Sequence, residues 1–424
     1  MPAPTLFQLA PARRARRLYA AVAVSASVLI ALLVAAPAVA AGGNEIDFFV
    51  GPVIGSERVI GLGGAFLSIA EGVDGHMVNP AAFAVRPVFF GNEWFDWDAG
   101  LSTFGTVGGG VDFDMSGREE SGAELSVSQV GFNLKFGRFG VGFHTLSQRL
   151  TLSTRDDDGT IKTRDFEQSI GGLGLAYALS DGEVVVGALI GVGLANIDSR
   201  LEPGDGSAPV AGHIGLASTS SPGTYGVLYA PRDQNFRIGA AMRLPTRIAG
   251  SSVAESSGDD AAKLTVPEAI VAPGSFAIGA SMMFGERPYN IRPAYGDAPL
   301  PRGSRQVAAI PRPYVLVATE LSISGPNSHG IGLASWFDGE AQPSGRGSAV
   351  SVRLGAESEI VPNRMIIRGG TYFEPSRFSG SPGRQHVTAG GDMRLTYGWD
   401  WRISVVMDLA PDYVNVAAGV GFWH

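Results

Sequence analysis

Hydrophobic and polar positions alternate one by one along the C-terminal part of the chain. Val350, Val352 and Leu354 fall on one parity, and Ser351 and Arg353 fall on the other. Similar alternation fills the runs 348–359, 364–373, 385–398, 400–410 and 413–423. A period of two predicts β-strands with one apolar and one polar face. Charged side chains of these runs keep to the polar parity, which indicates a sheet with different surroundings on its two faces.

Aromatic residues mark the ends of these predicted strands. They are Tyr372, Phe373, Tyr397, Trp399, Trp401 and Trp423. Transmembrane β-barrels carry such girdles at the membrane interfaces, around an apolar outer band and a polar lumen. The last run ends on Phe422-Trp423-His424, which is similar to the C-terminal strand signal of outer-membrane barrels. We expect an all-β chain that closes into a transmembrane antiparallel β-barrel, because open sheet edges do not persist in hydrocarbon; a soluble β-sandwich is the alternative.

Fourteen strands are expected, an even number as in bacterial single-chain barrels. Turn residues bound fifteen candidate runs, at 88–97, 125–136, 139–153, 161–179, 183–197, 223–230, 235–250, 268–283, 313–324, 330–337, 348–359, 364–373, 385–398, 400–410 and 413–423. Merging 313–337 into one interrupted strand gives fourteen, and sixteen is the alternative.

The N-terminus has the organisation of a secretory signal peptide over 1–40. The basic run Arg13–Arg17 precedes an uncharged stretch over 18–36, and Pro37–Ala40 has the small-x-small form that signal peptidase cleaves. We expect the mature chain to begin at Ala41. The apolar run is long for a signal peptide, so an uncleaved membrane anchor is the alternative.

Composition narrows the classes of function. The chain has no cysteine, and its 40 acidic residues exceed its 32 basic residues, which gives a net charge of −8. Disulfides and Cys-ligated metals are therefore excluded, and nucleic acid is not an expected partner. The six histidines show no metal-binding spacing, so no metal or cofactor is expected. A Ser-His phospholipase site at His144 with Ser147 or Ser169 has no surrounding motif, and an enzyme is not expected.

A different pattern fills 41–86, before the predicted wall strands. The glycine-rich stretch Gly61–Gly64 is followed by an expected short helix over 65–71, and Asn79-Pro80 predicts a turn. The spacing of the glycines gives neither GxGxxG nor GK[ST]. A dinucleotide or phosphate loop is therefore excluded.

With these elements the chain resembles the FadL family, the outer-membrane transporters of long-chain fatty acids and other hydrophobic compounds. The family's glycine-rich small helix and Asn-Pro-Ala turn are matched by Gly61–Ala70 and by Asn79-Pro80-Ala81. Further similar stretches are Tyr225–Pro231, Phe236–Ala241, Val352–Glu357 and Arg368–Ser376. The likeness thus spans the chain from Arg58 to the C-terminus.

The resemblance implies an N-terminal hatch (plug) over 41–86 in the lumen of a β-barrel over 87–424, in the bacterial outer membrane. It implies passive uptake of long-chain fatty acids or other hydrophobic compounds, with lateral exit into the membrane. Gating is implied for Gly61, Gly63, Gly64, Asn79, Pro80 and Ala81. Close packing of the glycines and a purely structural turn are the alternatives for these residues. The alternative function is a non-transporting barrel that serves as an assembly or secretion-complex subunit, like PorV-type relatives.

The polar parity of the strands carries charges of both signs. They are Arg353, Glu357, Arg368, Glu374, Asp392, Arg394, Arg402 and Asp408. We expect these lumenal side chains to pair across strands, with recognition of a carboxylate head group by the arginines as the alternative.

The Arg- and Pro-rich segment 284–312 is longer than the family's usual connection at this place. A solvated loop is expected there, and binding of lipopolysaccharide phosphates or of a partner is the alternative. The expected partners of the whole chain are outer-membrane lipid and lipopolysaccharide, a hydrophobic small-molecule substrate and the barrel assembly machinery.

Overall fold

A computed structural model describes most of the chain after residue 44. The described residues are 45–48, 51–87, 94–106, 112, 115–117, 124–217, 223–249, 253–257, 267–290, 311–337, 340–395 and 400–422. The predicted signal peptide over 1–40 and the aromatic residues Tyr397, Trp399 and Trp423 lie outside these ranges. Within them, no helix is both long and apolar enough to cross a membrane.

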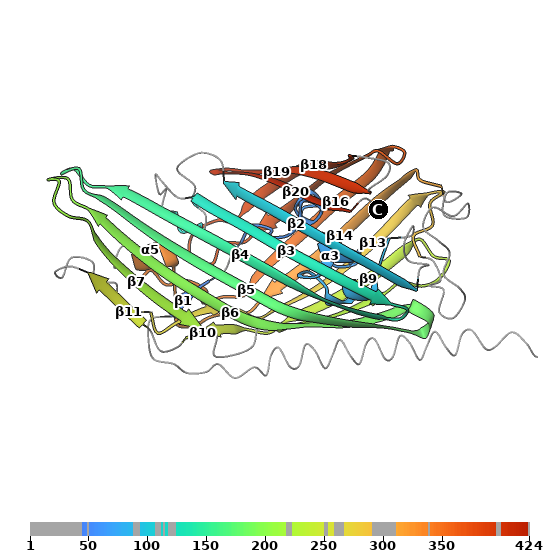
Figure 1. Ribbon diagram of the computed structural model, residues 1–424, viewed down its shortest axis with the longest axis horizontal. Coiled ribbons are helices and arrows are strands. Elements are labelled where there is room, and N and C mark those ends of the chain that lie inside the picture. The colour runs from blue at the N-terminus through green and yellow to red at the C-terminus, as the bar shows by residue number, and fades with distance from the viewer. Residues whose placement is uncertain are drawn as a thin grey trace, which may run out of the picture. The chain divides into compact units, whose positions relative to one another are not determined.

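Fourteen of the described strands form a closed antiparallel wall, which confirms the predicted barrel (Figure 1). In order around the wall they are β2 (Phe95–Thr106), β3 (Glu124–Phe136), β4 (Phe139–Arg155), β5 (Ile161–Leu179), β6 (Val184–Glu202), β8 (Gly223–Tyr229), β9 (Phe236–Arg243), β13 (Ser275–Gly285), β14 (Tyr314–Ser324), β16 (Ala349–Val361), β17 (Met365–Glu374), β18 (Arg384–Arg394), β19 (Trp401–Ala410) and β20 (Tyr413–Phe422). The pairs β2–β20 and β6–β8 close the ring. A short 3-10 helix, η2 (Ser180–Gly182), joins β5 to β6.

Strands β4, β5 and β6 are much longer than other strands of the wall, such as β17, β19 and β20. They contain 17, 19 and 19 residues, whereas β17, β19 and β20 contain 10 each. Because about 9–11 tilted residues suffice to cross a bilayer, the long strands project beyond it. The projecting half of β6 pairs with β7 (Val210–Ala217), and β7 pairs with β11 (Val253–Ser257). The sequence pattern did not predict β7.

A small second sheet ties the N-terminal chain to the barrel. It contains β10 (Thr246–Ile248), β12 (Ala269–Ala272), β1 (Glu45–Asp47) and β15 (Gly330–Ile331). β10 and β12 continue the β9–β13 hairpin, but β12 then pairs with β1 in parallel instead of with a wall strand. The prediction of a wall strand over 330–337 was wrong, because this segment forms β15 and helix α5 (Leu333–Phe337). Leu333, Trp336 and Phe337 have helical spacing, and all three are buried.

Side-chain parity in the wall follows the predicted alternation. On β19, Val405 and Met407 are 48% and 45% exposed on the outer face, whereas Arg402 and Asp408 are 7% and 1% exposed on the inner face. The prediction of an apolar outer surface and a polar lumen is therefore confirmed. A closed barrel with these two faces is an outer-membrane β-barrel.

One rim of the barrel carries a cluster of aromatic rings. The ring centroids of Phe95 and Phe136 are 5.3 Å apart, and those of Trp97 and Phe422 are 4.6 Å apart. The two-residue turn between β3 and β4 lies at this rim, as does the end of β20. Short turns face the periplasm in outer-membrane barrels, so this rim is the periplasmic one.

Residues 51–87, called the hatch from here on, lie against the inner face of the wall. The hatch contains α2 (Glu57–Gly61), α3 (Gly72–Gly75) and the 3-10 helix η1 (Pro80–Ala84). α2 contacts β17–β20, α3 contacts β2 and β3, and η1 contacts β3–β6 and β8. The hatch therefore reaches across the lumen from one side of the wall to the other.

The predicted helix over 65–71 was wrong, because the helix precedes the glycines. The Ser56 hydroxyl caps α2 by accepting a hydrogen bond from the Val59 N–H (3.4 Å). Gly63 and Gly64 have positive φ angles, which end the helix. Residues 65–71 are irregular, with a turn over 67–69.

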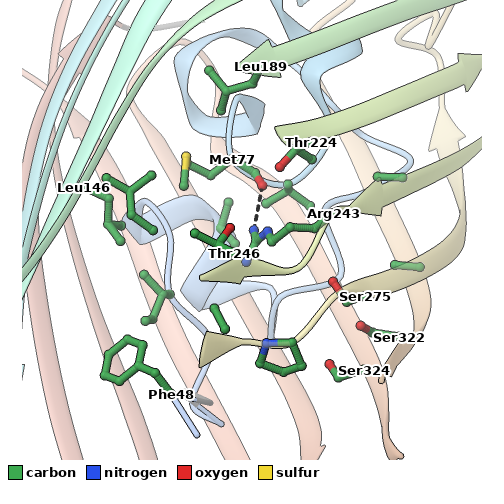
Figure 2. Close-up of a pocket in the computed structure, with 18 of the residues that line it drawn as sticks. Phe48, Met77, Leu146, Leu189, Thr224, Arg243, Thr246, Ser275, Ser322 and Ser324 are labelled. Carbon is green, nitrogen blue, oxygen red and sulfur yellow. Dashed lines mark hydrogen bonds between the residues drawn. The ribbon is translucent and has the colours of Figure 1, made fainter. Parts of the chain in front are cut away.

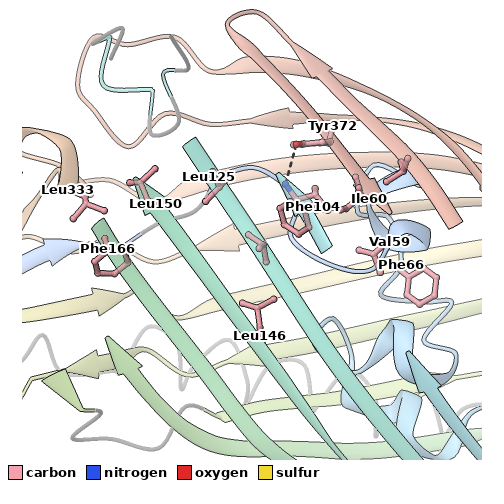
Figure 3. Close-up of a cluster of buried hydrophobic side chains, with 14 of the residues drawn as sticks. Val59, Ile60, Phe66, Phe104, Leu125, Leu146, Leu150, Phe166, Leu333 and Tyr372 are labelled. Carbon is pink, nitrogen blue, oxygen red and sulfur yellow. Dashed lines mark hydrogen bonds between the residues drawn. The ribbon is translucent and has the colours of Figure 1, made fainter. Parts of the chain in front are cut away.

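A hydrophobic cluster packs the hatch onto the wall (Figure 3). Val59 and Phe66 of the hatch belong to it together with Phe104 of β2. Tyr372, which was predicted to lie in the aromatic girdle, points into the lumen and belongs to the same cluster. Its hydroxyl accepts a hydrogen bond from the Val53 N–H (3.2 Å), because position 372 has the lumenal parity of β17.

Candidate functional site

Glycines on the lumenal face of the wall let the hatch backbone approach it closely. Gly355 and Gly370 face each other on β16 and β17, and the backbone of Leu62 and Gly63 lies over them. A Cβ atom at position 370 would lie 2.9 Å from the Gly63 Cα. Hatch backbone comes similarly close at Gly140, Gly187 and Gly239, and hatch side chains do so at Gly174 and Gly226. The wall therefore needs glycine where the hatch is seated.

The hatch glycines predicted as site residues lie at this seat. Gly63 and Gly64 have φ angles of +59° and +79°, which glycine adopts without steric cost. A Cβ atom at Gly63 would lie 2.7 Å from the Thr371 backbone N. The Gly61 carbonyl accepts a hydrogen bond from the Thr388 hydroxyl (3.0 Å). Backbone conformation and close packing thus explain glycine at these positions.

The predicted Asn-Pro-Ala turn joins two parts of the hatch to the wall. Asn79 is fully buried, and its Nδ2 donates to the carbonyls of Leu67 (2.9 Å) and of Val227 in β8 (3.1 Å). Its Oδ1 accepts from the Ala81 N–H (3.1 Å), which caps η1 at Pro80. The asparagine amide therefore satisfies backbone groups from three separate segments.

A chain of buried ion pairs connects the hatch to the wall. It runs Arg237–Glu71–Arg58–Glu357–Arg368–Asp392–Arg402–Asp74, with N–O distances of 2.6 to 3.3 Å. Positive and negative groups alternate along it, so every charge has an opposite neighbour. Buried charges require such pairing. Four of the eight predicted lumenal charges, at Glu357, Arg368, Asp392 and Arg402, are consecutive members of this chain.

The other predicted lumenal charges lie elsewhere. Arg353 pairs with a glutamate of β14 (2.9 Å). Glu374 and Asp408 both contact the imidazole of His386, at 2.7 and 2.8 Å. Arg394 lies at the periplasmic end of β18 and pairs within the turns there. The structure therefore separates these residues into three groups.

Four members of the ion chain were not predicted from the sequence. They are Arg58, Glu71 and Asp74 of the hatch and Arg237 of β9. Arg58 and Glu357 are 299 positions apart, so no local spacing could have indicated their contact. The alternation in β9 could have placed Arg237 on the lumenal face, because the next residue, Ile238, is apolar and exposed on the outer face.

Glu57 of α2 is the hatch carboxylate that has a hydroxyl partner instead of an arginine. It accepts a hydrogen bond from the Ser102 hydroxyl of β2. Burial, reinforced by the nearby Asp74 carboxylate, raises the pKa of Glu57 to about 7, although the Ser102 bond and Arg402 oppose the shift. This carboxyl therefore changes charge near neutral pH while the hatch is seated.

A cavity of about 240 Å³ lies between the hatch and the wall (Figure 2). Apolar side chains line one part of it, among them Leu146 and Leu189 of the wall and Met77 of the hatch. Serines line another part, among them Ser275 and Ser322. An apolar cavity of about 150 Å³ is large enough to hold benzene. The cavity therefore has the size and the mixed lining expected for a small amphipathic molecule.

Arg243 of β9 supplies an uncompensated positive charge to this cavity. Its guanidinium is open to the cavity and donates a hydrogen bond to the Met77 carbonyl (3.2 Å; Figure 2). Arg353 and Glu320 also line the cavity and pair with each other. Within the part of the chain that the structure describes, no carboxylate pairs with Arg243. The lining thus carries one more positive than negative charge.

The start of segment 284–312 is packed at the periplasmic rim rather than solvated as expected. The Asn290 Oδ1 accepts from Arg237 Nε (2.8 Å), and the Tyr289 carbonyl accepts from the same guanidinium (2.8 Å). The Tyr289 hydroxyl contacts the Ser281 hydroxyl (2.7 Å). Residues 291–310 of this segment lie outside the described residues.

The structure does not assemble the Ser-His arrangement considered from the sequence. His144 faces the lumen, whereas Ser147 and Ser169 have the outward parity and contact each other (3.0 Å). In the described ranges, no group of three or more histidine, aspartate or glutamate side chains is placed to hold a metal ion.

These features define a bacterial outer-membrane β-barrel with an N-terminal segment packed in its lumen. Solved structures of this class align with most of this chain and over nearly their whole length. A Pseudomonas aeruginosa FadL homologue is 12% identical, with 87% of this chain and 97% of that chain covered and a TM-score of 0.53. The Ralstonia pickettii toluene transporter TbuX is 13% identical (87% and 98% covered, TM-score 0.52).

A deltaS2 mutant of the TodX monoaromatic hydrocarbon channel is 14% identical, with 89% of this chain and 100% of that chain covered and a TM-score of 0.54. No protein-family model matches the sequence, and no curated protein matches it. The chain therefore has the fold of the FadL-type barrels, which confirms the resemblance predicted from its motifs.

Proposed function

We propose that the chain is a passive outer-membrane uptake channel for hydrophobic compounds, and that long-chain carboxylates are among its substrates. The cavity between the hatch and the wall carries this proposal. Burial of an apolar solute contributes roughly 0.8 kcal/mol per CH₂ group, and a solute that moves down its own gradient needs no other energy source. The names of the similar structures, a toluene transporter and a monoaromatic hydrocarbon channel, support a hydrophobic substrate.

Arg243 favours an acidic head group over a neutral hydrocarbon. A carboxylate would form a charge-assisted hydrogen bond with the guanidinium and would compensate its charge. The apolar lining around Leu146 and Leu189 suits the first part of an alkyl chain. A chain longer than the cavity requires the hatch to move, because hatch residues close one side of it.

The hatch would act as the gate, at Gly61, Gly63, Gly64, Asn79, Pro80 and Ala81. Under this proposal residues 1–40 are removed as a signal peptide, the whole plug extends over 41–86 as predicted, and 87–424 form the barrel. The solute would leave sideways through the wall into the membrane. Outer-membrane lipid, lipopolysaccharide and the barrel assembly machinery are the partners that such a protein requires.

Uptake of a labelled long-chain fatty acid into liposomes tests the proposal. Vesicles that contain the protein should take up the fatty acid faster than empty vesicles. Arg243→Leu should lower this rate about 10-fold. The variant loses the hydrogen bond between the guanidinium and the carboxylate of the fatty acid, and a hydrogen bond to a charged group contributes about 1.5–3 kcal/mol. Uptake of toluene should change much less, because toluene has no carboxylate.

Arg200→Leu is the matched control, since Arg200 is exposed at the outer end of β6 and pairs with Glu202 (2.9 Å). Its uptake rate should equal that of the unaltered protein. Equal rates in protein-containing and empty vesicles would instead leave the non-transporting assembly or secretion subunit as the better account.

A further inference from the structure

Two buried glutamines, Gln148 and Gln168, lie next to each other in the wall of the cavity. We infer that Gln148 and Gln168 bind an uncharged hydroxyl group on an otherwise apolar ligand, so that hydroxylated compounds are preferred. This inference rests on the proposed function, because it concerns the ligand of the same cavity.

The two glutamines are direct neighbours on adjacent strands. Gln148 of β4 is paired in register with Gln168 of β5, and both have the lumenal parity. They are 5% and 1% exposed, and both line the cavity. The Gln148 Nε2 donates a hydrogen bond to the Gln168 Oε1 (2.6 Å). The next lumenal pair along the strands, Leu146 and Ile170, is apolar.

Each amide keeps one group without a partner. The Gln148 Oε1 and the Gln168 Nε2 are buried and make no hydrogen bond with any residue that the structure describes. Turning both amides around exchanges the two roles, yet one carbonyl oxygen and one NH₂ group still stay free. The pair therefore offers one acceptor and one donor in either orientation.

An uncharged hydroxyl group matches this pair of free groups. It donates one hydrogen bond and accepts others, so a single hydroxyl can satisfy both amides. A carboxylate only accepts hydrogen bonds, and a methyl group does neither. Because unpaired buried polar groups destabilise a protein, binding of a hydroxyl relieves a cost that an apolar ligand leaves in place.

Binding of 4-methylphenol and of toluene to the purified barrel tests the inference. These compounds share one skeleton and differ by a single hydroxyl group. The double variant Gln148→Leu, Gln168→Leu removes both amides at similar volume. Its affinity for 4-methylphenol should fall about 3- to 10-fold, which is the usual net effect of one or two hydrogen bonds. Its affinity for toluene should stay the same or rise.

Gln129→Leu is the matched control, because Gln129 is a buried lumenal glutamine of β3 outside the cavity lining. This variant should bind both compounds as the unaltered protein does. Heat-dependent gel mobility shows whether each variant still forms a closed barrel.

Unchanged affinity of the double variant for 4-methylphenol would overturn the inference and would indicate that a bound water satisfies the two amides. Failure of the unaltered protein to bind 4-methylphenol would overturn it as well. The proposed function has a separate readout, since uptake of the labelled fatty acid into vesicles does not depend on the hydroxyl preference.

Discussion

The close fit between Gly370 and the hatch gives a sharp test of how the hatch is held. In Gly370→Ala the new methyl group would lie 2.9 Å from the Gly63 Cα, and the Leu62 carbonyl carbon is closer still. Carbon atoms normally approach to about 3.5–4.0 Å, so the hatch backbone has to move away from the wall, into the lumen. Overpacking of this kind costs about 1–3 kcal/mol. Since 1.4 kcal/mol corresponds to a factor of ten, the displaced hatch should become roughly 5- to 150-fold more populated.

Gly369→Ala on the same strand is the matched control for this test. Its methyl group would lie 3.6 Å from the Thr388 carbonyl oxygen, which is an ordinary contact. Hydrogen–deuterium exchange over residues 51–87, measured by mass spectrometry, should accelerate in Gly370→Ala and stay unchanged in Gly369→Ala. Equal exchange in the two variants, with both barrels intact by gel mobility, would refute the idea that wall glycines seat the hatch.

Two further changes in the hatch have defined expected outcomes. The raised pKa of Glu57, about 7 against 4.5, means that the seated hatch binds more protons than the released hatch between these values, so seating should weaken as pH rises from 5 to 8. The full effect is about 3 kcal/mol at most, and Glu57→Gln should abolish this pH dependence of hatch exchange; a persisting dependence would assign it to another group. Asn79→Ala leaves the Leu67 and Val227 carbonyls without their side-chain donor and should destabilise the seated hatch by about 1–3 kcal/mol. Exchange at unaltered rates in this variant would contradict a structural role for the asparagine.

The wall could be predicted from the sequence because each strand carries its own signal. Val405 and Asp408 take opposite faces through a period of two, and this periodicity is a property of the backbone of one strand. Closure followed from the chemistry of hydrocarbon, which does not satisfy an open edge. No long-range information was needed for either conclusion.

The inner sheet could not be predicted in the same way. β10 and β12 lie within the predicted wall strands 235–250 and 268–283. What distinguishes them is long-range pairing, because β10 pairs with β12 and β12 pairs with β1. Leu333–Phe337 was misassigned because a short buried apolar run fits a strand or a helix equally well. The projecting strand β7 was missed for a related reason, since its pairing is set by the length of β6.

Only part of the site could be predicted, because it combines hatch residues with wall residues from distant parts of the chain. The glycines and Asn79 were visible as local motifs, and the lumenal charges were visible as one parity of the strands. The partners of these charges depend on where the hatch sits, and the hatch position is fixed by the glycines of the closed wall. Neither the Arg58–Glu357 contact nor the Gln148–Gln168 pair has a local signature of function.

The lumen has two different sides, and this asymmetry bears on how a solute passes. On the side of β16–β19 the hatch is held by buried ion pairs such as Arg58–Glu357 and Arg402–Asp74. Removal of one partner from such a pair costs about 3–5 kcal/mol. On the side of β4–β6, η1 packs on the wall, but Met77 of the hatch borders the cavity and is only partly buried. We therefore expect a bound solute to displace the hatch residues that border the cavity before it disturbs the ion chain, which keeps the hatch attached to the barrel.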